Sequence, residues 1–170
     1  MRLQKAIFAI VLVFLLGGAM NEVIAEEDKL PSADAVLIAL NSSLGDQNAL
    51  VDAFARLYPE SHVLDRGEDK ILIDLWANGQ PYASVFMFQT ASPNGMTAIF
   101  SYWDPDILVT HFAANAEKWV KAEIGPLTTT LTSAPGLPET TASLGKLSVT
   151  LSRVASGEES QLDITFSLSD

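Results

Sequence analysis

The stretch KILIDLWANGQPYASVFMFQT, residues 70–90, decides the fold of this chain. Two runs rich in β-branched and aromatic residues, 70–77 and 82–90, lie on either side of Asn78-Gly79. An Asn-Gly pair between two such runs is the strongest short-range signal of a β-hairpin, because both residues accept the backbone conformation of a two-residue turn. The stretch therefore predicts two antiparallel strands joined at Asn78-Gly79.

The turn also predicts which side chains lie opposite one another. With Asn78-Gly79 as the two-residue loop, the expected pairs are Ala77 with Gln80, Leu75 with Tyr82, Ile73 with Ser84, and Ile71 with Phe86. The other face of the hairpin would then carry Leu72, Asp74, Val85 and Met87. Pro81 lacks a backbone N–H group, so we expect it at the beginning of its strand or beside a bulge.

A third strand extends the hairpin into an antiparallel meander. The turn signal is Ser92-Pro93-Asn94-Gly95, and the strand covers residues 96–103. Both faces of the meander are apolar, most clearly at residues 85–88, whereas a sheet with one solvated face should alternate between apolar and polar residues. The sheet is therefore either covered on both faces or leaves an apolar surface for another molecule.

Two helices precede the meander. Ser32 is a good N-cap for the first helix, and Gly45 closes it. Asp46 caps the second helix, which Pro59 ends. The connection between the helices is short, so we expect an antiparallel pair, followed by a short strand at 62–64.

The longest helix follows the meander. Asp104 suits the N-cap, Pro105 the first helical position, and Asp106 the positive end of the helix dipole. Its apolar stripe consists of Leu108, Val109, Phe112, Ala113, Ala116, Trp119 and Val120. Gly125-Pro126 ends the helix.

The C-terminal part predicts more strands. Residues 127–132 can supply one strand, whereas 134–145 are expected to lack regular structure, and 146–155 and 161–168 form a second hairpin. Because strands are grouped rather than alternating with helices, the fold class is α+β. The expected architecture is an antiparallel sheet, made of the central three-stranded meander and the C-terminal hairpin, packed with two N-terminal helices and one long middle helix.

The first 25 residues are typical of a cleavable secretory signal peptide. Arg2 and Lys5 supply the positive charge, and residues 6–16 form an apolar run of 11 residues. A secretory apolar region spans about 7–15 residues, whereas a membrane-spanning helix needs about 20. Small residues at the required positions predict cleavage between Ala25 and Glu26, and the alternative is an uncleaved N-terminal anchor.

The predicted organisation is a signal peptide (1–25), an acidic mobile lead-in (26–31) and one α+β domain (32–170). Of the 10 basic and 21 acidic residues of the chain, 8 and 20 remain after residue 25, a net charge of −12. Nucleic acids and anionic membranes require clustered Lys and Arg, so neither is an expected partner. We expect the mature protein in the periplasm or the extracellular medium, without membrane attachment.

No motif typical of an enzyme occurs in the chain. The absence of cysteine excludes disulfides and thiol chemistry, and His62 and His111 lie 49 residues apart without the spacing of a metal site. Nucleophile and phosphate-binding signatures are also missing. We therefore expect neither a metal nor a cofactor, and an enzyme is the less favoured reading. A small hydrolase that uses carboxylates such as Asp74 or Asp104 is the enzymatic alternative.

The candidate binding residues are aromatic. Trp76, Tyr82, Tyr102 and Trp103 lie near predicted strand ends, where the mouth of a pocket can form, and Asp74 shares a strand face with Trp76. The alternative is that these aromatic residues form the core beneath the helices. The leading hypothesis is a non-enzymatic exported module that binds a protein partner or an apolar small molecule. A structural homodimer that pairs through a sheet edge is a third hypothesis.

The mature protein is predicted to begin at Glu26. Replacement of Ala25 by Leu should block processing because the position before the cut requires a small residue, whereas Ala25→Ser should be processed normally. Intact-mass measurement of the protein recovered outside the cytoplasm checks this. A mature chain that begins at Met20, after Gly17-Gly18-Ala19, would contradict the predicted position.

Overall fold

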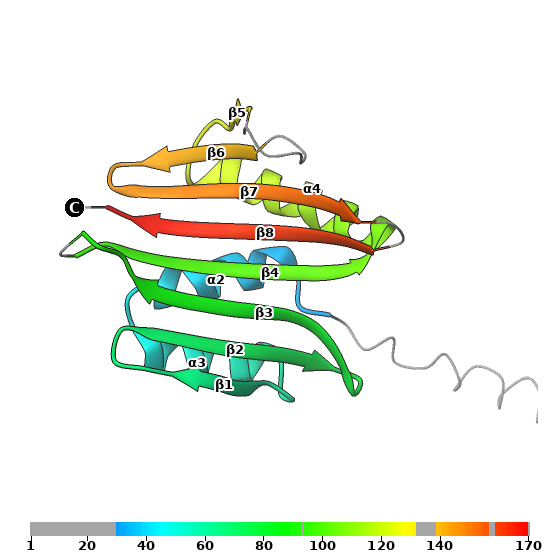
Figure 1. Ribbon diagram of the computed structural model, residues 1–170. Coiled ribbons are helices and arrows are strands. Elements are labelled where there is room, and N and C mark those ends of the chain that lie inside the picture. Colours follow the sequence, from blue (N-terminus) through cyan, green and yellow to red (C-terminus); the bar gives the residue numbers. More distant parts are fainter. Residues whose placement is uncertain (1–29, 93, 132–138, 157–158, 170) are drawn as a thin grey trace, which may run out of the picture. The chain divides into compact units, whose positions relative to one another are not determined.

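One eight-stranded antiparallel sheet runs through the protein in the order β1-β2-β3-β4-β8-β7-β6-β5 (Figure 1). The computed structural model describes residues 30–92, 94–131, 139–156 and 159–169. The strands are β1 (His62–Arg66), β2 (Lys70–Ala77), β3 (Gln80–Gln89), β4 (Met96–Pro105), β5 (Thr128–Thr130), β6 (Glu139–Leu144), β7 (Leu147–Ser156) and β8 (Glu159–Leu168). The predicted cleavage position between Ala25 and Glu26 lies outside the described residues.

Three described helices cover the same face of the sheet. They are α2 (Ala33–Ser43), α3 (Gln47–Leu57) and α4 (Asp106–Glu123). In Figure 1 all three lie behind the strands, and α2 packs against both α3 and α4. The predicted α+β class with an antiparallel sheet is confirmed. No described helix is long and apolar enough to cross a membrane.

The two N-terminal helices begin where the sequence predicts. The Ser32 Oγ accepts a hydrogen bond from the Ala35 amide at 3.3 Å. Asp46 Oδ1 accepts from the Asn48 and Ala49 amides at 2.9 and 3.0 Å. Each cap satisfies backbone N–H groups that have no partner within the helix. Ser32 and Asp46 therefore mark the starts of the two helices, and Gly45 lies in the connection between them.

The first hairpin turns at Asn78-Gly79, and both residues have positive φ angles, 55° and 68°, as such a turn requires. The predicted register holds only for Ala77 with Gln80. Beyond it, Trp76 lies opposite Pro81 and Leu75 opposite Ala83, so Tyr82 is an extra residue in a β-bulge.

The bulge shifts all later pairs by one residue, so the predicted assignment of β3 side chains to the two faces of the sheet is wrong. Ile73 pairs with Val85 rather than Ser84, and Leu72 pairs with Phe86. A shift of one residue moves side chains to the opposite face of a strand. The observed register puts apolar Val85, rather than polar Ser84, beside Ile73 in the core.

The core lies between the sheet and the three helices. The sheet contributes alternate residues, which are Ile71, Ile73, Leu75, Ala83, Val85, Met87, Ala98, Phe100, Tyr102, Ala142, Val149, Leu151, Leu162, Ile164 and Phe166. Phe100 is its aromatic centre, because the ring stacks with Phe54 of α3 at 6.1 Å and with Phe112 of α4 at 6.0 Å. One side chain therefore joins the sheet to two helices.

Two predictions for the chain after β3 are wrong. Helix α4 begins at Asp106 with Pro105 as its N-cap residue, so Asp104 belongs to β4 and caps nothing. Part of 134–145, expected to be irregular, forms β6, which pairs with both β5 and β7. The Thr- and Ser-rich sequence of β6 carries little apolar signal, and its pairing comes from its neighbours.

Substitution of Phe100 by Ala should lower the free energy of unfolding by about 3–5 kcal/mol, because it opens a cavity in the core. Phe86→Ala should cost roughly half of that or less, since Phe86 lies on the other face of the sheet and is only half-buried. Urea denaturation of both variants measures the difference. Equal losses would contradict the assignment of the two faces.

Candidate functional site

The sheet face opposite α2, α3 and α4 is the candidate site, and we call it the open face. No described helix covers it (Figure 1). Burial alternates along the strands accordingly: in β3, Val85 and Met87 are buried whereas Ser84, Phe86 and Phe88 are half-buried. Of the two alternatives that the sequence predicts, a sheet covered on both faces or a sheet with one apolar face left uncovered, the described residues therefore agree with the second.

An apolar patch occupies the β2–β4 part of the open face. It consists of Leu72, Trp76, Phe86, Phe88, Ile99 and Trp103, all of them half-buried. Leu72 pairs with Phe86, and Phe86 with Ile99, so these three side chains form a row across the strands. The Phe86 and Phe88 rings stack at 4.9 Å. Leu72, Phe86, Phe88 and Ile99 therefore form a contiguous apolar surface of the kind that a binding site needs, whereas Trp76 and Trp103 lie beyond Asp74 and Ser101 on the same strands.

The tryptophans lie toward one end of the same face. The Trp76 ring meets the exposed His62 edge-on, with centroids 6.1 Å apart. Trp103 lies opposite Gln161 of β8. Of the predicted site residues, Asp74, Trp76 and Trp103 therefore share the open face.

A polar row runs beside the apolar one. Asp74 pairs with Ser84, Ser84 with Ser101, and Ser101 with Asp163, so two carboxylates mark its ends. Gln161 Nε2 donates a hydrogen bond to Asp163 Oδ1 at 2.7 Å. Both aspartates are half-buried. The row gives the open face directional hydrogen-bonding groups next to its apolar patch.

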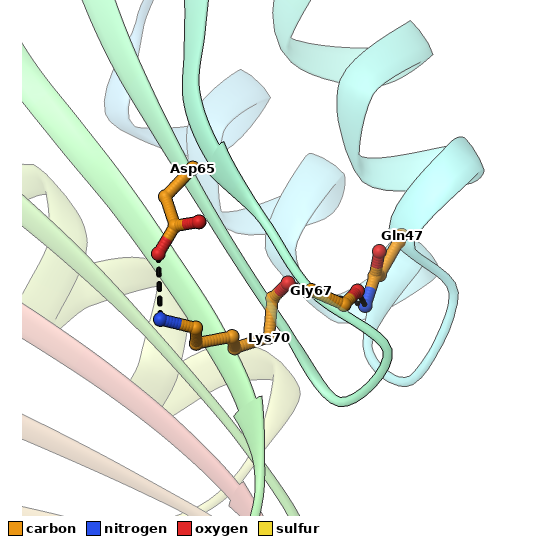
Figure 2. Close-up of polar contacts among 4 residues, drawn as sticks. All are labelled: Gln47, Asp65, Gly67 and Lys70. Atoms are coloured by element: carbon orange, nitrogen blue, oxygen red, sulfur yellow. Dashed lines mark hydrogen bonds and ion pairs between the residues drawn. The ribbon is translucent and has the colours of Figure 1, made fainter.

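At the β1 side, Lys70 Nζ lies 2.6 Å from Asp65 Oδ2, as Figure 2 shows. The hydrogen bond from Lys70 holds the pKa of the Asp65 carboxyl below its ordinary value, and Asp65 in turn raises the pKa of Lys70. Gln47 of α3 bonds the Gly67 carbonyl on the same turn at 3.2 Å. The turn is thus hydrogen-bonded to helix α3, and the charge of Lys70 is paired with that of Asp65.

Hydroxyl groups dominate the other half of the open face. Outward positions of β6, β7 and β8 carry Thr141, Ser148, Thr150, Ser152, Thr165 and Ser167. Thr141 and Thr150 are joined through their hydroxyls at 3.0 Å, and Thr97 reaches Ser167 at 3.2 Å. This half is suited to water, and the apolar patch is confined to β2–β4.

The predicted tyrosines lie apart from the open face. Tyr102 is buried on the helix side of β4, and Tyr82, the bulge residue, packs against the core. The Tyr102 hydroxyl donates to Asp104 Oδ2 at 3.2 Å. Burial, reinforced by the nearby Asp104, raises the pKa of Tyr102, and burial also raises the pKa of Asp104.

The structure separates the carboxylates of the hydrolase alternative. Asp74 lies on the open face, whereas Asp104 bonds Tyr102 on the helix side. General acid and base groups must reach one substrate, so Asp74 and Asp104 do not form an acid–base pair with each other. Among the described residues, no group of three His, Asp or Glu side chains is placed to hold a metal. His111 lies exposed on α4, 3.2 Å from Asn115.

Sheet edge β1, relevant to the homodimer hypothesis, is exposed at all five residues. Its pairing with β2 is interrupted by a register shift between Val63 and Asp65. Such a bulge twists an edge strand and discourages pairing with another edge. Edge β1 is therefore poorly suited to pairing with the edge of another sheet.

Phe86, Phe88 and Asp163 escaped prediction as site residues. The predicted register pairs Phe86 with Ile71, which the bulge at Tyr82 overturns, and Asp163 lies 89 positions after Asp74 in the chain. Alternation in 161–168 was the available signal for Asp163, but it does not tell which strand lies next to β8. In comparisons with known proteins, no family model, no curated protein and no solved structure matches this chain.

Replacement of Asp104 by Asn should stabilise the protein increasingly as pH rises. Because burial raises its pKa above 3.8, the folded protein holds the Asp104 proton more tightly than the unfolded chain does, and ionisation lowers stability above that pH. Asn retains an acceptor for Tyr102 and carries no charge. Urea denaturation from about pH 3.5 to pH 7 measures the effect.

The exposed Asp52 of α3 provides the matched control, since Asp52→Asn removes the same charge from the surface. Its free energy of unfolding should follow that of the wild type across the titration. A D104N curve that stays parallel to the wild type would show that Asp104 ionises equally in both states.

Proposed function

We propose that this protein is an exported, non-enzymatic binding module whose open face holds a protein partner or an apolar ligand. The observation that carries the proposal is the apolar patch of β2–β4, with Phe86 and Phe88 stacked at 4.9 Å on a face that no described helix covers. Apolar surface of this kind is stabilised by contact with another molecule.

The chemistry of the face agrees with binding rather than turnover. The apolar row Leu72–Phe86–Ile99 lies beside the polar row that ends in Asp74 and Asp163. An apolar centre bordered by hydrogen-bonding groups is the usual composition of a recognition surface. The signal peptide predicted at 1–25 would bring this surface to the periplasm or the medium.

A photo-crosslinking amino acid, p-benzoylphenylalanine, in place of Phe86 tests the proposal in the producing cell. Irradiation should yield specific adducts, identified by mass spectrometry, because the ring would lie within the contact. The same amino acid in place of Ile38, which is 56% exposed on α2, is the matched control and should yield none of these adducts. Equal adducts from both positions, or none from position 86, would contradict the proposal.

A further inference from the structure

Two carboxylates lie beside the Leu72–Phe86–Ile99 row, and neither forms an ion pair with a described residue. Asp74 and Asp163 lie in one row across β2, β3, β4 and β8, with Ser84 and Ser101 between them. Neighbouring strands are about 4.8 Å apart, so three steps separate the two aspartates by about 14 Å. The row runs directly beside the apolar side chains of Leu72, Phe86 and Ile99.

The nearby lysine and arginine side chains are paired with other groups, and His62, which lies opposite Asp74, contacts the Trp76 ring and forms no ion pair with the carboxylate. Lys70 is held by Asp65 at 2.6 Å. Arg66 and Arg153 belong to the helix side, where Arg66 bonds Asn48 and Arg153 bonds Glu117 at 2.6 and 3.2 Å. Within the described residues neither Asp74 nor Asp163 forms an ion pair. The open face therefore combines apolar surface with uncompensated negative charge.

Apolar surface together with negative charge restricts which kind of molecule can bind the open face. A second copy that docked face to face would bring the same aspartates together, and like charges oppose such contact. An anionic membrane surface would be repelled in the same way. A small neutral molecule can cover the apolar row, but it leaves both carboxylates without a counter-charge. A polypeptide with apolar and basic side chains satisfies both features.

We propose that the open face recognises a cationic, apolar polypeptide segment, with its Lys or Arg side chains at Asp74 and Asp163 and its apolar side chains on the Leu72–Phe86–Ile99 row. This inference rests on the proposed function of the open face. A span of about 14 Å corresponds to about four residues of an extended segment or about nine of a helix. The partner should therefore carry basic residues at one of these spacings.

Three labelled 14-residue peptides test the proposal on the full-length protein by fluorescence anisotropy. One contains leucine and lysine in an amphipathic pattern, and in the others glutamine or glutamate replaces every lysine. The lysine peptide should bind most tightly, and its affinity should fall as salt is raised. The double variant D74N/D163N should bind it about tenfold more weakly, since each rim charge pair contributes modestly.

A matched variant separates recognition from general attraction by an acidic protein. D52N/E123Q removes two charges from exposed positions of α3 and α4, and it should change affinity less than twofold. Equal losses in the two double variants would overturn the inference. Thermal unfolding of each variant establishes that the fold is retained, and the isosteric Asn side chains preserve the bond from Gln161 to position 163.

Phe86→Ser distinguishes failure of this inference from failure of the proposed function. Weaker binding of the lysine peptide, with its salt dependence retained, supports both. If all three peptides bind equally and Phe86→Ser abolishes binding, the open face is an apolar site and the charge-based inference is wrong. If Phe86→Ser changes the binding of no peptide, or if sedimentation shows that a face-to-face dimer excludes the peptides, the proposed cationic partner is rejected.

Discussion

The pairing of β2 with β3 depends on one residue that cannot donate a backbone hydrogen bond. Pro81 comes directly after the first pair of the hairpin, and the strand accommodates it with a bulge at Tyr82. Because successive side chains point to opposite faces, this extra residue decides that Val85 enters the core and Phe86 remains on the open face. The registers of β3 with β4 and of β4 with β8 then determine which side chains of these strands lie on each face. The candidate site is therefore a consequence of one local irregularity.

Local signals were enough to predict most elements of the fold. Ser32 and Asp46 cap their helices as expected, and the Asn78-Gly79 turn has the backbone angles that its residue types favour. The antiparallel α+β class followed from the grouping of strands. The position of β8 beside β4 was not predictable, because that pairing joins segments about 60 residues apart and leaves no local pattern. Strand β6 was missed because its neighbours, rather than its own composition, stabilise it.

The candidate site was predictable only in part, for a related reason. Asp74 and Trp76 share a face because they lie two residues apart in β2, and alternation within one strand is a short-range property. Trp103 of β4 joins them through the registers of β3 with both neighbours. Tyr82 and Tyr102 fall on the other side of the sheet, where the bulge and the aromatic contacts of the core hold them. That Asp163 belongs to the candidate site could be predicted only from the strand order, which places β8 beside β4. A sequence thus indicates which residues of one strand act together, whereas the assembly of a site across strands requires the registers of all of them.

The two halves of the open face differ in what they require from their surroundings. On β6, β7 and β8, the outward side chains carry hydroxyl groups, which can hydrogen-bond to one another, as Thr141 and Thr150 do, or to solvent, so exposure of this half costs little free energy. On β2–β4, the stacked Phe86 and Phe88 rings expose apolar surface that water does not stabilise. The register shift in β1 discourages extension of the sheet at its edge, and the like charges of Asp74 and Asp163 oppose self-association of the face. These features favour a different molecule, rather than another copy of this chain, as the occupant of the apolar half.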